Sequence, residues 1–192
     1  ALPISVSTLG HAHPKLTRAL TEQINSVLHT SNLYRIANQE KLADKLAAIS
    51  GMDNAFFCNS GCEANEAAIK LARLHGHQKG IESPAIVVMD QSFHGRTLAT
   101  LSATGNRKVQ AGFEPLVSGF VRVPFNELAT VKQLGDQNIV AVLVEPIQGE
   151  GGINVSTMEY LRGLREICDQ RGWLLMLDEV QCGLGRTGKW IV

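Results

Sequence analysis

Residues 173–188 read WLLMLDEVQCGLGRTG, an apolar run that ends in two acids, an amide and a glycine-rich turn. About six apolar residues bounded by turn residues are typical of a strand that is buried on both faces. In open α/β sheets, ligands bind at the carboxyl ends of such strands. We therefore expect this strand to deliver Asp178 to a site at the edge of a sheet.

Strands and helices are predicted to alternate through the rest of the chain. Four more segments have the length and apolar character of strands, and they cover residues 55–58, 85–90, 119–123 and 139–145. Helices are predicted over residues 63–75, 127–134 and 158–170. Strands joined through helices of this length pair in parallel. The expected fold is α/β, with a mainly parallel sheet and helices on both faces.

Three helices carry start or stop signals. In residues 14–28, apolar side chains recur at three- and four-residue spacing behind Pro14, a residue allowed at the first helical position. A second helix is predicted over residues 42–49, and Gly51 follows where a left-handed C-terminal cap belongs. Before the helix at 158–170, Ser156 and Glu159 have the spacing of a capping box.

The composition argues against several function classes. The 192 residues are 44% hydrophobic, and 18 basic side chains balance 18 acidic ones. The sequence has no basic block that would follow a phosphate backbone, and no apolar run near the roughly 20 residues of a membrane helix. The spacing of its cysteines and histidines predicts no metal site. We expect a soluble, cytoplasmic protein that binds neither nucleic acid nor membrane.

Polar or glycine-rich loops follow four of the predicted strands. The loop at 59–66 leads directly into a helix, whose N-terminal amides and dipole attract phosphate, although an ordinary N-cap is the simpler alternative. The loop at 92–97 sets an aromatic ring beside an imidazole and a guanidinium, which could stack on a cofactor and bind a carboxylate, or simply be a packed loop. The loop at 145–152 has two acids on a turn whose glycines allow close approach to a ligand or merely make the turn.

The fourth loop invites a different interpretation. Residues 183–189, GLGRTGK, come close to the phosphate-binding loop of NTPases, but Trp190 stands where the magnesium-binding Ser or Thr is required, and the loop directly follows the acidic strand. Pyridoxal 5′-phosphate explains all four loops better. It needs an anion cradle for its phosphate, a stacking surface for its ring, a carboxylate for its pyridine nitrogen and a lysine, and the loops offer the first three.

Four separated motifs resemble the class III aminotransferases, the ω-amino-acid type that uses pyridoxal phosphate. The motifs are SGCEANEAAIK, SFHGRTL, EPIQGEGG and LDEVQCGLGRTG, in the family's order. Within the family, ATGN at 103–106 and GFEPLVSGFVRVPFN at 112–126 look most like the acetylornithine branch. The resemblance implies amino-group transfer between N-acetylornithine and 2-oxoglutarate in arginine biosynthesis. The ornithine and 4-aminobutyrate branches share these loops and stay open as alternatives.

The resemblance implies cofactor-binding roles for residues in two of the loops. Gly61 and Cys62 would bind the cofactor phosphate through their backbone amides, with Ser60 alongside. Phe93 would stack on the cofactor ring, and His94 would lie beside it in the same site.

For the fourth loop, the resemblance implies contacts with the cofactor ring. Asp178 would pair with the pyridine nitrogen, because a buried carboxylate holds the proton on that nitrogen. Val180 would pack on the ring face away from Phe93, and Gln181 would reach the phenolic oxygen. Glu179 would support these residues from behind.

Substrate contacts are also implied by the resemblance. Arg96 would clamp a substrate carboxylate, and Glu145 and Glu150 would lie beside the substrate channel. The substrates would be small amino acids and 2-oxo acids, and a homodimer is expected because the family generally forms dimers.

The resemblance implies fold type I of the pyridoxal-phosphate-dependent transferases, in an incomplete form. Residues 1–50 would form an N-terminal helical segment and residues 51–192 an incomplete cofactor-binding large domain. The Schiff-base lysine and the small C-terminal domain would lie beyond residue 192, because no lysine of the sequence stands at the matching position. We therefore expect this chain alone to be inactive, and a non-catalytic piece that acts only by association is the alternative.

Overall fold

A computed structural model describes residue 7, residues 9–135 and residues 138–191. The chain divides into two units, Ala1–Ala55 and Phe56–Val192. In the described part of the chain, no helix has both the length and the apolar character needed to cross a membrane.

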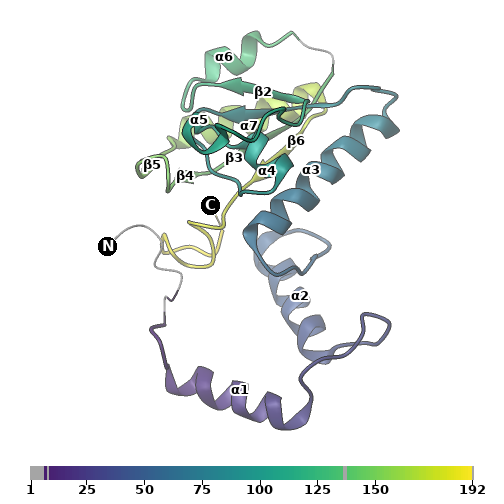
Figure 1. The fold of residues 1–192 in the computed structure, drawn as a ribbon, viewed down its shortest axis with the longest axis vertical. Helices are drawn as coiled ribbons and strands as arrows, with labels where there is room; N and C mark the ends of the chain where they lie inside the picture. The colour runs from purple at the N-terminus through teal and green to yellow at the C-terminus, as the bar shows by residue number, and fades with distance from the viewer. Residues whose placement is uncertain (1–6, 8, 136–137, 192) are drawn as a thin grey trace. The chain divides into compact units, whose positions relative to one another are not determined.

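The described residues of the N-terminal unit form helices α1 (Pro14–Ser26) and α2 (Ala37–Ser50) (Figure 1). The predicted signals at both helices are confirmed, because α1 begins at Pro14 and Gly51 caps α2 with a φ of 71°. The second helix starts earlier than the predicted residue 42. Neither helix has a fully buried residue, and Leu20 on α1 is 54% exposed.

The larger unit is built on a four-stranded sheet in which every pair of neighbours is parallel (Figure 1). Its order is β2-β1-β3-β6, with strands β1 (Ala85–Met89), β2 (Phe120–Val123), β3 (Ile139–Val144) and β6 (Leu174–Leu177). This confirms the predicted α/β class and parallel sheet. The two central strands, β1 and β3, are buried at every position, because helices cover both faces of the sheet.

One face of the sheet packs against α7 (Met158–Arg171). Val87 and Val142 point to this side and meet Leu164 and Ile167 of the helix. Helix α6 (Leu128–Gln133) covers the same face, since Val131 belongs to the same cluster. Fully burying an aliphatic side chain of this size stabilises the fold by about 1.5–3 kcal/mol.

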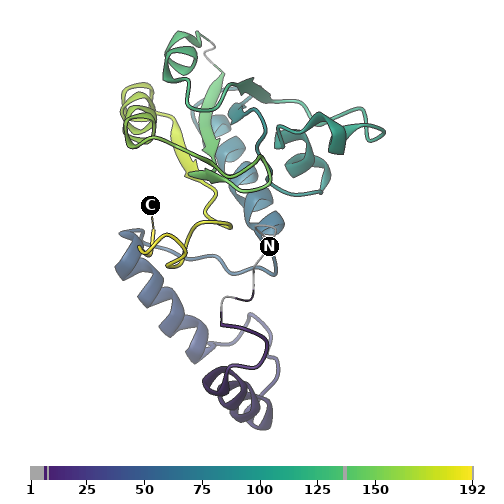
Figure 2. The ribbon, with the colours of Figure 1, turned by 90° about the vertical axis from the view of Figure 1, so that its left-hand side faces the viewer.

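The opposite face packs against α3 (Gly61–Gln78), as Figure 2 shows. Ile86 and Leu143 alternate with the residues of the first face, and they contact Ile69 and Ala72 of α3. This alternation follows from the two-residue repeat of a strand, which sends successive side chains to opposite faces. The sheet therefore holds α3 and α7 on opposite sides.

Where the structure describes them, the remaining connections contain short elements. They are α4 (Leu98–Ala103), α5 (Arg107–Gln110), and the antiparallel pair β4 (Ile147–Gln148) and β5 (Asn154–Val155).

Three local predictions are wrong. Residues 55–58 form no strand, because they pair with no described strand and Phe56 is 72% exposed. Strand β6 is not buried on both faces, since it lies at the edge of the four described strands and Leu177 is 37% exposed. Helix α7 is capped by Thr157, whose Oγ1 accepts a hydrogen bond from the Tyr160 amide at 3.1 Å, so Ser156 forms no capping box.

The strand order places a topological switch at the centre of the sheet. The chain leaves β1 toward β2 on one side and then returns to β3 on the other side of β1. In open α/β sheets, ligands bind outside the carboxyl ends of the strands at such a switch. The carboxyl ends of β1, β3 and β6 are therefore the place to look for a site.

Candidate functional site

The predicted loops after β1, β3 and β6 meet at one edge of the sheet. Asp178 directly follows β6, and its backbone N–H donates to the Val144 carbonyl at 2.9 Å, which extends the parallel ladder by one residue. Glu145 follows the neighbouring strand β3, and the loop with Phe93 and His94 follows β1. The backbone hydrogen bonds of the sheet therefore fix where each loop starts, independently of the side-chain contacts described next.

Asp178 is the centre of this edge. Its carboxylate is buried and accepts hydrogen bonds at both oxygens. Oδ2 lies 2.8 Å from Nδ2 of Asn65 and 2.8 Å from Nδ1 of His94, and Oδ1 accepts from the Val180 amide at 3.2 Å. These contacts hold the carboxylate in one place, so the arrangement can present a fixed hydrogen-bond acceptor to an N–H group.

His94 is as deeply buried as Asp178. Its backbone N–H donates to Oγ1 of Thr104 at 3.0 Å, and its carbonyl accepts from Nδ2 of Asn65 at 3.1 Å. With Nδ1 on the Asp178 carboxylate, the buried Nε2 has no hydrogen-bond partner in the described structure. The imidazole is thus oriented by Asp178 and by its own backbone.

Glu145 is a second buried carboxyl group at the same edge. Its Oε1 accepts a hydrogen bond from the Phe93 amide at 2.7 Å, which ties the loop after β3 to the loop after β1. Burial raises the pKa of Glu145 to about 8, and the negative charge of Asp178 adds to the rise, while the amides of Phe93 and Gly149 oppose it. Glu145 is therefore largely protonated at neutral pH.

Helix α3 begins beside these strand ends. Ser60 is its N-cap, with Oγ accepting from the Glu63 amide at 3.2 Å, while the Glu63 carboxylate accepts from the Asn59 amide at 2.6 Å. The ordinary N-cap is thus present, and it occupies the Ser60 side chain. The amides of Gly61 and Cys62 have no partner within the helix, because the first turn of any helix lacks acceptors for them. Such amides can bind an anion.

Two close packings join the loop after β6 to the other loops. A Cβ built on Gly61 would lie 2.6 Å from Cγ2 of Val180, so only glycine fits there without a shift. A Cβ on Gly149 would lie 2.8 Å from Cγ of Gln181. Val180 therefore lies against the start of α3, and Gln181 lies against the glycine-rich turn after β3.

The Cys62 side chain faces the loop at 92–97. Its Sγ lies 3.3 Å from Oγ1 of Thr100 and 3.5 Å from Oγ1 of Thr97. Burial raises the pKa of the thiol, but these hydroxyls and nearby backbone amides outweigh burial and lower it. Thr97 also donates to the Glu66 carboxylate, which ties the loop to α3 a second time.

The structure brings most of the predicted site residues together, but not all of them by direct contact. Hydrogen bonds join His94 to Asp178 and Phe93 to Glu145, and close packing joins Gly61 to Val180. The remaining predicted polar residues lie at the surface or partly exposed around this core. Arg96 and Glu150 are exposed, and Glu179 is half-buried.

Asn65 is the site residue that the sequence prediction missed. It is buried on α3, and it bridges Asp178 and the His94 carbonyl. Asparagine is a poor helix former, so its place inside α3, past the capping positions, is the one signal that could have drawn attention to it.

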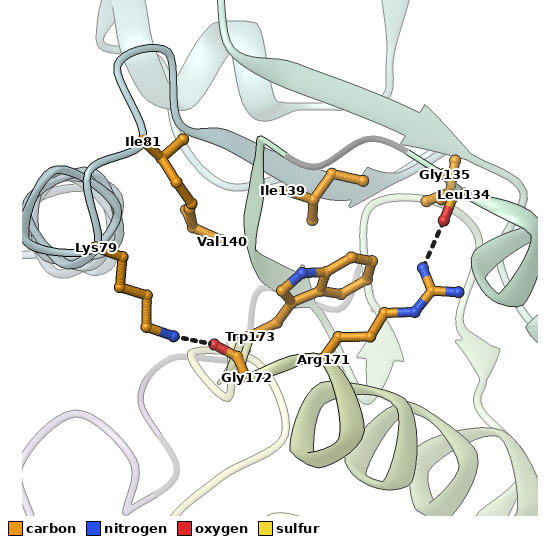
Figure 3. A pocket seen from close by; sticks show the side chains of 9 residues that line it. All are labelled: Lys79, Ile81, Leu134, Gly135, Ile139, Val140, Arg171, Gly172 and Trp173. Atoms are coloured by element: carbon orange, nitrogen blue, oxygen red, sulfur yellow. Dashed lines mark hydrogen bonds between the residues drawn. The ribbon is translucent and has the colours of Figure 1, made fainter.

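Asp178 lines neither of two cavities found among the described residues of the larger unit. One of about 470 Å³ opens at the amino ends of the strands, next to Trp173 (Figure 3). Its two cations are already bound to carbonyls: Nζ of Lys79 donates to Gly172 at 2.5 Å, and the Arg171 guanidinium donates to Leu134 and stacks over the Trp173 ring. Another of about 400 Å³ lies beyond β1 and β2, with Asp90 on its wall. Among the described residues, no three His, Cys, Asp or Glu side chains group to hold a metal.

The family model of class III aminotransferases matches residues 2–191. Among the relatives, an acetylornithine aminotransferase of Nitrosomonas europaea is 65% identical over 189 residues, which are 97% of this chain and 48% of that protein. The chain thus spans about half the length of such relatives.

Solved structures give the same picture of the fold. One is the ornithine aminotransferase of Toxoplasma gondii, which was crystallised in the presence of oxidised glutathione and has PLP (pyridoxal 5′-phosphate) at partial occupancy in its active site. It superposes with a TM-score of 0.89 at 32% identity, over 95% of this chain and 44% of that one. The N-acetylornithine aminotransferase of Stenotrophomonas maltophilia K279a superposes with a TM-score of 0.82 at 36% identity, over 98% of this chain and 47% of that one.

Proposed function

Since the chain belongs to the class III aminotransferase family, we propose that it forms the cofactor-binding part of an enzyme that uses pyridoxal 5′-phosphate. The proposed reaction transfers an amino group between N-acetylornithine and 2-oxoglutarate, in arginine biosynthesis. The choice of substrate rests on the names of the similar relatives, several of which are acetylornithine aminotransferases. The observation that carries the cofactor is the buried carboxylate of Asp178 beside the start of α3.

The Asp178 carboxylate fits the pyridine end of this cofactor. When bound, pyridoxal phosphate supplies an electron sink for charge that develops on the substrate, and a protonated ring nitrogen makes the sink stronger. Asp178 can accept a hydrogen bond from that nitrogen, because contacts with Asn65, His94 and the Val180 amide hold its carboxylate in place. Oδ2 already contacts Asn65 and His94, whereas the described structure gives Oδ1 one hydrogen-bond partner, the Val180 amide. We therefore assign Oδ1 to the ring nitrogen.

The start of α3 fits the phosphate end. Gly61 and Cys62 would donate their backbone amides to the phosphate, with the helix dipole adding to the attraction. Ser60 caps the helix with its side chain and so keeps these amides in place. Val180, packed on Gly61, would line the cofactor ring together with Phe93, while Gln181 would reach its phenolic oxygen and Glu179 would support the turn.

The substrate end is assigned to three residues around this core. The exposed guanidinium of Arg96 would bind a substrate carboxylate, since its planar fork suits that group. Glu145 and Glu150 would lie beside the substrate. Because Glu145 holds its proton at neutral pH, it adds little negative charge next to Asp178 and would not repel an anionic 2-oxo acid.

The proposal is tested on the complete gene product that contains this chain. We expect the purified protein to bind pyridoxal 5′-phosphate, with a visible absorption band, and to transfer the amino group of N-acetylornithine to 2-oxoglutarate faster than that of ornithine or 4-aminobutyrate. Replacing Asp178 by Asn should abolish turnover while the phosphate end still binds. A protein that binds no pyridoxal phosphate would refute the cofactor, and a preference for ornithine would refute only the substrate.

We also propose that the complete protein is a homodimer. Support comes from apolar side chains that the N-terminal unit leaves exposed, because exposed apolar groups of this size favour contact with another surface. Ile24 is 58% exposed on α1, and Leu33 and Tyr34 are more exposed still. Light scattering of the complete protein should give twice the monomer mass, and a monomer at micromolar concentration would exclude the dimer.

A further inference from the structure

Asn65 is a buried polar side chain at the site to which the proposed function gives no role. It comes from the second turn of α3, the helix that begins at Gly61. Its Nδ2 donates to Oδ2 of Asp178 at 2.8 Å and to the carbonyl of His94 at 3.1 Å. An amide NH₂ has two hydrogens, so both are committed, and both acceptors face the nitrogen. This pair of contacts also fixes which end of the amide points toward the site.

The two bonds of Asn65 join three parts of the site. Asp178 follows β6, His94 lies in the loop after β1, and Asn65 itself belongs to α3. The same helix presents the amides of Gly61 and Cys62 at its start. The rigid helix therefore sets the separation between those amides and the Asp178 carboxylate.

We propose that Asn65 is a positioning residue for the cofactor site, one that holds Asp178 and the loop with Phe93 at a fixed place relative to the start of α3. The inference rests on the proposed use of pyridoxal phosphate. Asn65 and His94 both contact Oδ2, and the Val180 amide donates to Oδ1, the oxygen that we assign to the ring nitrogen. The hydrogen bond that Asn65 donates also holds the Asp178 carboxylate in one orientation, so its loss lets the carboxylate move away from the ring nitrogen.

Two substitutions separate this role from simple packing. Asn65→Ala removes both donated bonds. Asn65→Asp keeps the shape but replaces the donor by a carboxyl group next to the Asp178 carboxylate. Such a pair holds one shared proton, since two charges this close oppose each other. While the pair holds the shared proton, residue 65 can donate one hydrogen bond to Asp178. At higher pH the proton is lost, and that donor is lost with it.

The control is Asn154→Ala, because Asn154 also donates two bonds through its Nδ2, to Gln148 at 3.3 Å and to the Gly151 carbonyl at 3.0 Å. Neither acceptor touches Asp178. Affinity for pyridoxal 5′-phosphate is measured on the complete gene product by reconstitution of the cofactor-free protein. The ¹⁵N shift of labelled pyridoxal phosphate reports whether its ring nitrogen carries the proton.

We expect Asn65→Ala to weaken cofactor binding by about tenfold or more, the usual effect of losing a hydrogen bond to a charged group. Its ring nitrogen should lose the proton at a lower pH than in the wild type. Asn65→Asp should bind more tightly near pH 6, where the shared proton restores one of the two donated bonds, than near pH 9, where that donor is lost. The control should match the wild type at both pH values.

A merely structural role would lower the unfolding temperature of Asn65→Ala and leave the proton on the ring nitrogen, and that result would overturn the inference. Equal affinities for Asn65→Ala and the wild type, or a pH-independent Asn65→Asp, would overturn it too. If the wild type bound no pyridoxal phosphate, the proposed function would fail first. The hydrogen-bond network of Asn65, Asp178 and His94 can then still be tested without cofactor. The ¹⁵N signals of the His94 imidazole in the cofactor-free protein should shift in Asn65→Ala, and unchanged signals would refute the network.

Discussion

Replacing Gly61 by alanine tests the contact between the start of α3 and the loop after β6. The new Cβ would lie 2.6 Å and 2.8 Å from the two γ-methyl carbons of Val180, and 3.3 Å from its Cβ. A valine side chain is short and stiff, so the backbone of one segment has to shift. Overpacking of this kind costs about 1–3 kcal/mol. Removing a glycine from a helix returns at most about 1 kcal/mol, so the variant should be less stable.

The second substitution, Val180→Ala, removes both methyl groups that the new Cβ would meet. Val180 is largely exposed, so its own replacement should change the free energy of unfolding by about 0.5 kcal/mol or less. In this background Gly61→Ala should become neutral or slightly stabilising. The two substitutions should therefore couple by about 1–3 kcal/mol.

The four proteins of this cycle are compared by urea unfolding without cofactor, followed by circular dichroism. Cofactor affinity is measured separately, because a shift of α3 would also move the amides proposed to bind phosphate. The reasoning would be refuted if Gly61→Ala lowered the free energy of unfolding equally in the wild-type and in the Val180→Ala background. The same holds if Gly61→Ala stabilised the wild-type background.

Three other predictions test the burial and electrostatics of the larger unit. The raised pKa of Glu145 contributes stability that is complete below the ordinary glutamate pKa near 4.5 and is lost as pH rises through about 8. In urea titrations, Glu145→Gln should therefore gain stability relative to the wild type as pH rises from about 5 to about 8.5. Parallel pH profiles of the two proteins would contradict this. Thr100→Val removes a hydrogen bond to Cys62 and should raise the pKa of that thiol, which slows its alkylation by iodoacetamide at pH 8, while an unchanged rate would count against the bond. Leu164→Ala should lower the free energy of unfolding by about 2–5 kcal/mol, because the side chain is fully buried between α7 and the sheet, and a loss below 1 kcal/mol would show that the site collapses around it.

Much of the fold could be predicted from the sequence because its central strands are unusually clear. Residues 139–144 are apolar without a break, and a run of this length between polar turns fits a strand covered on both faces. The same reasoning failed at residues 55–58, which look equally apolar. A strand also needs a hydrogen-bonded neighbour, and the letters of a short segment carry no information about where that neighbour lies.

The site could be predicted only in part, for a related reason. Asp178 and Glu145 were found because acids at the end of an apolar run are unusual, and strand order brings such ends together. Asn65 was missed because its partners come from two other segments. Its role depends on which face of α3 meets the sheet, and local spacing alone could not indicate that the side chain bridges two distant loops.

The bond between Asn65 and Asp178 joins residues that are 113 positions apart in the chain. Closing so long a loop costs about 4 kcal/mol of chain entropy, a cost that no local contact offsets early in folding. Helix α3 and the pairing of β1 with β3 can form first, but the carboxylate reaches its partners only when β6 adds to the edge of the sheet. We therefore expect the candidate site at this edge to form last in folding. A substitution that slows the pairing of β6 with β3 would delay formation of the site even if the substituted residue contacts no ligand.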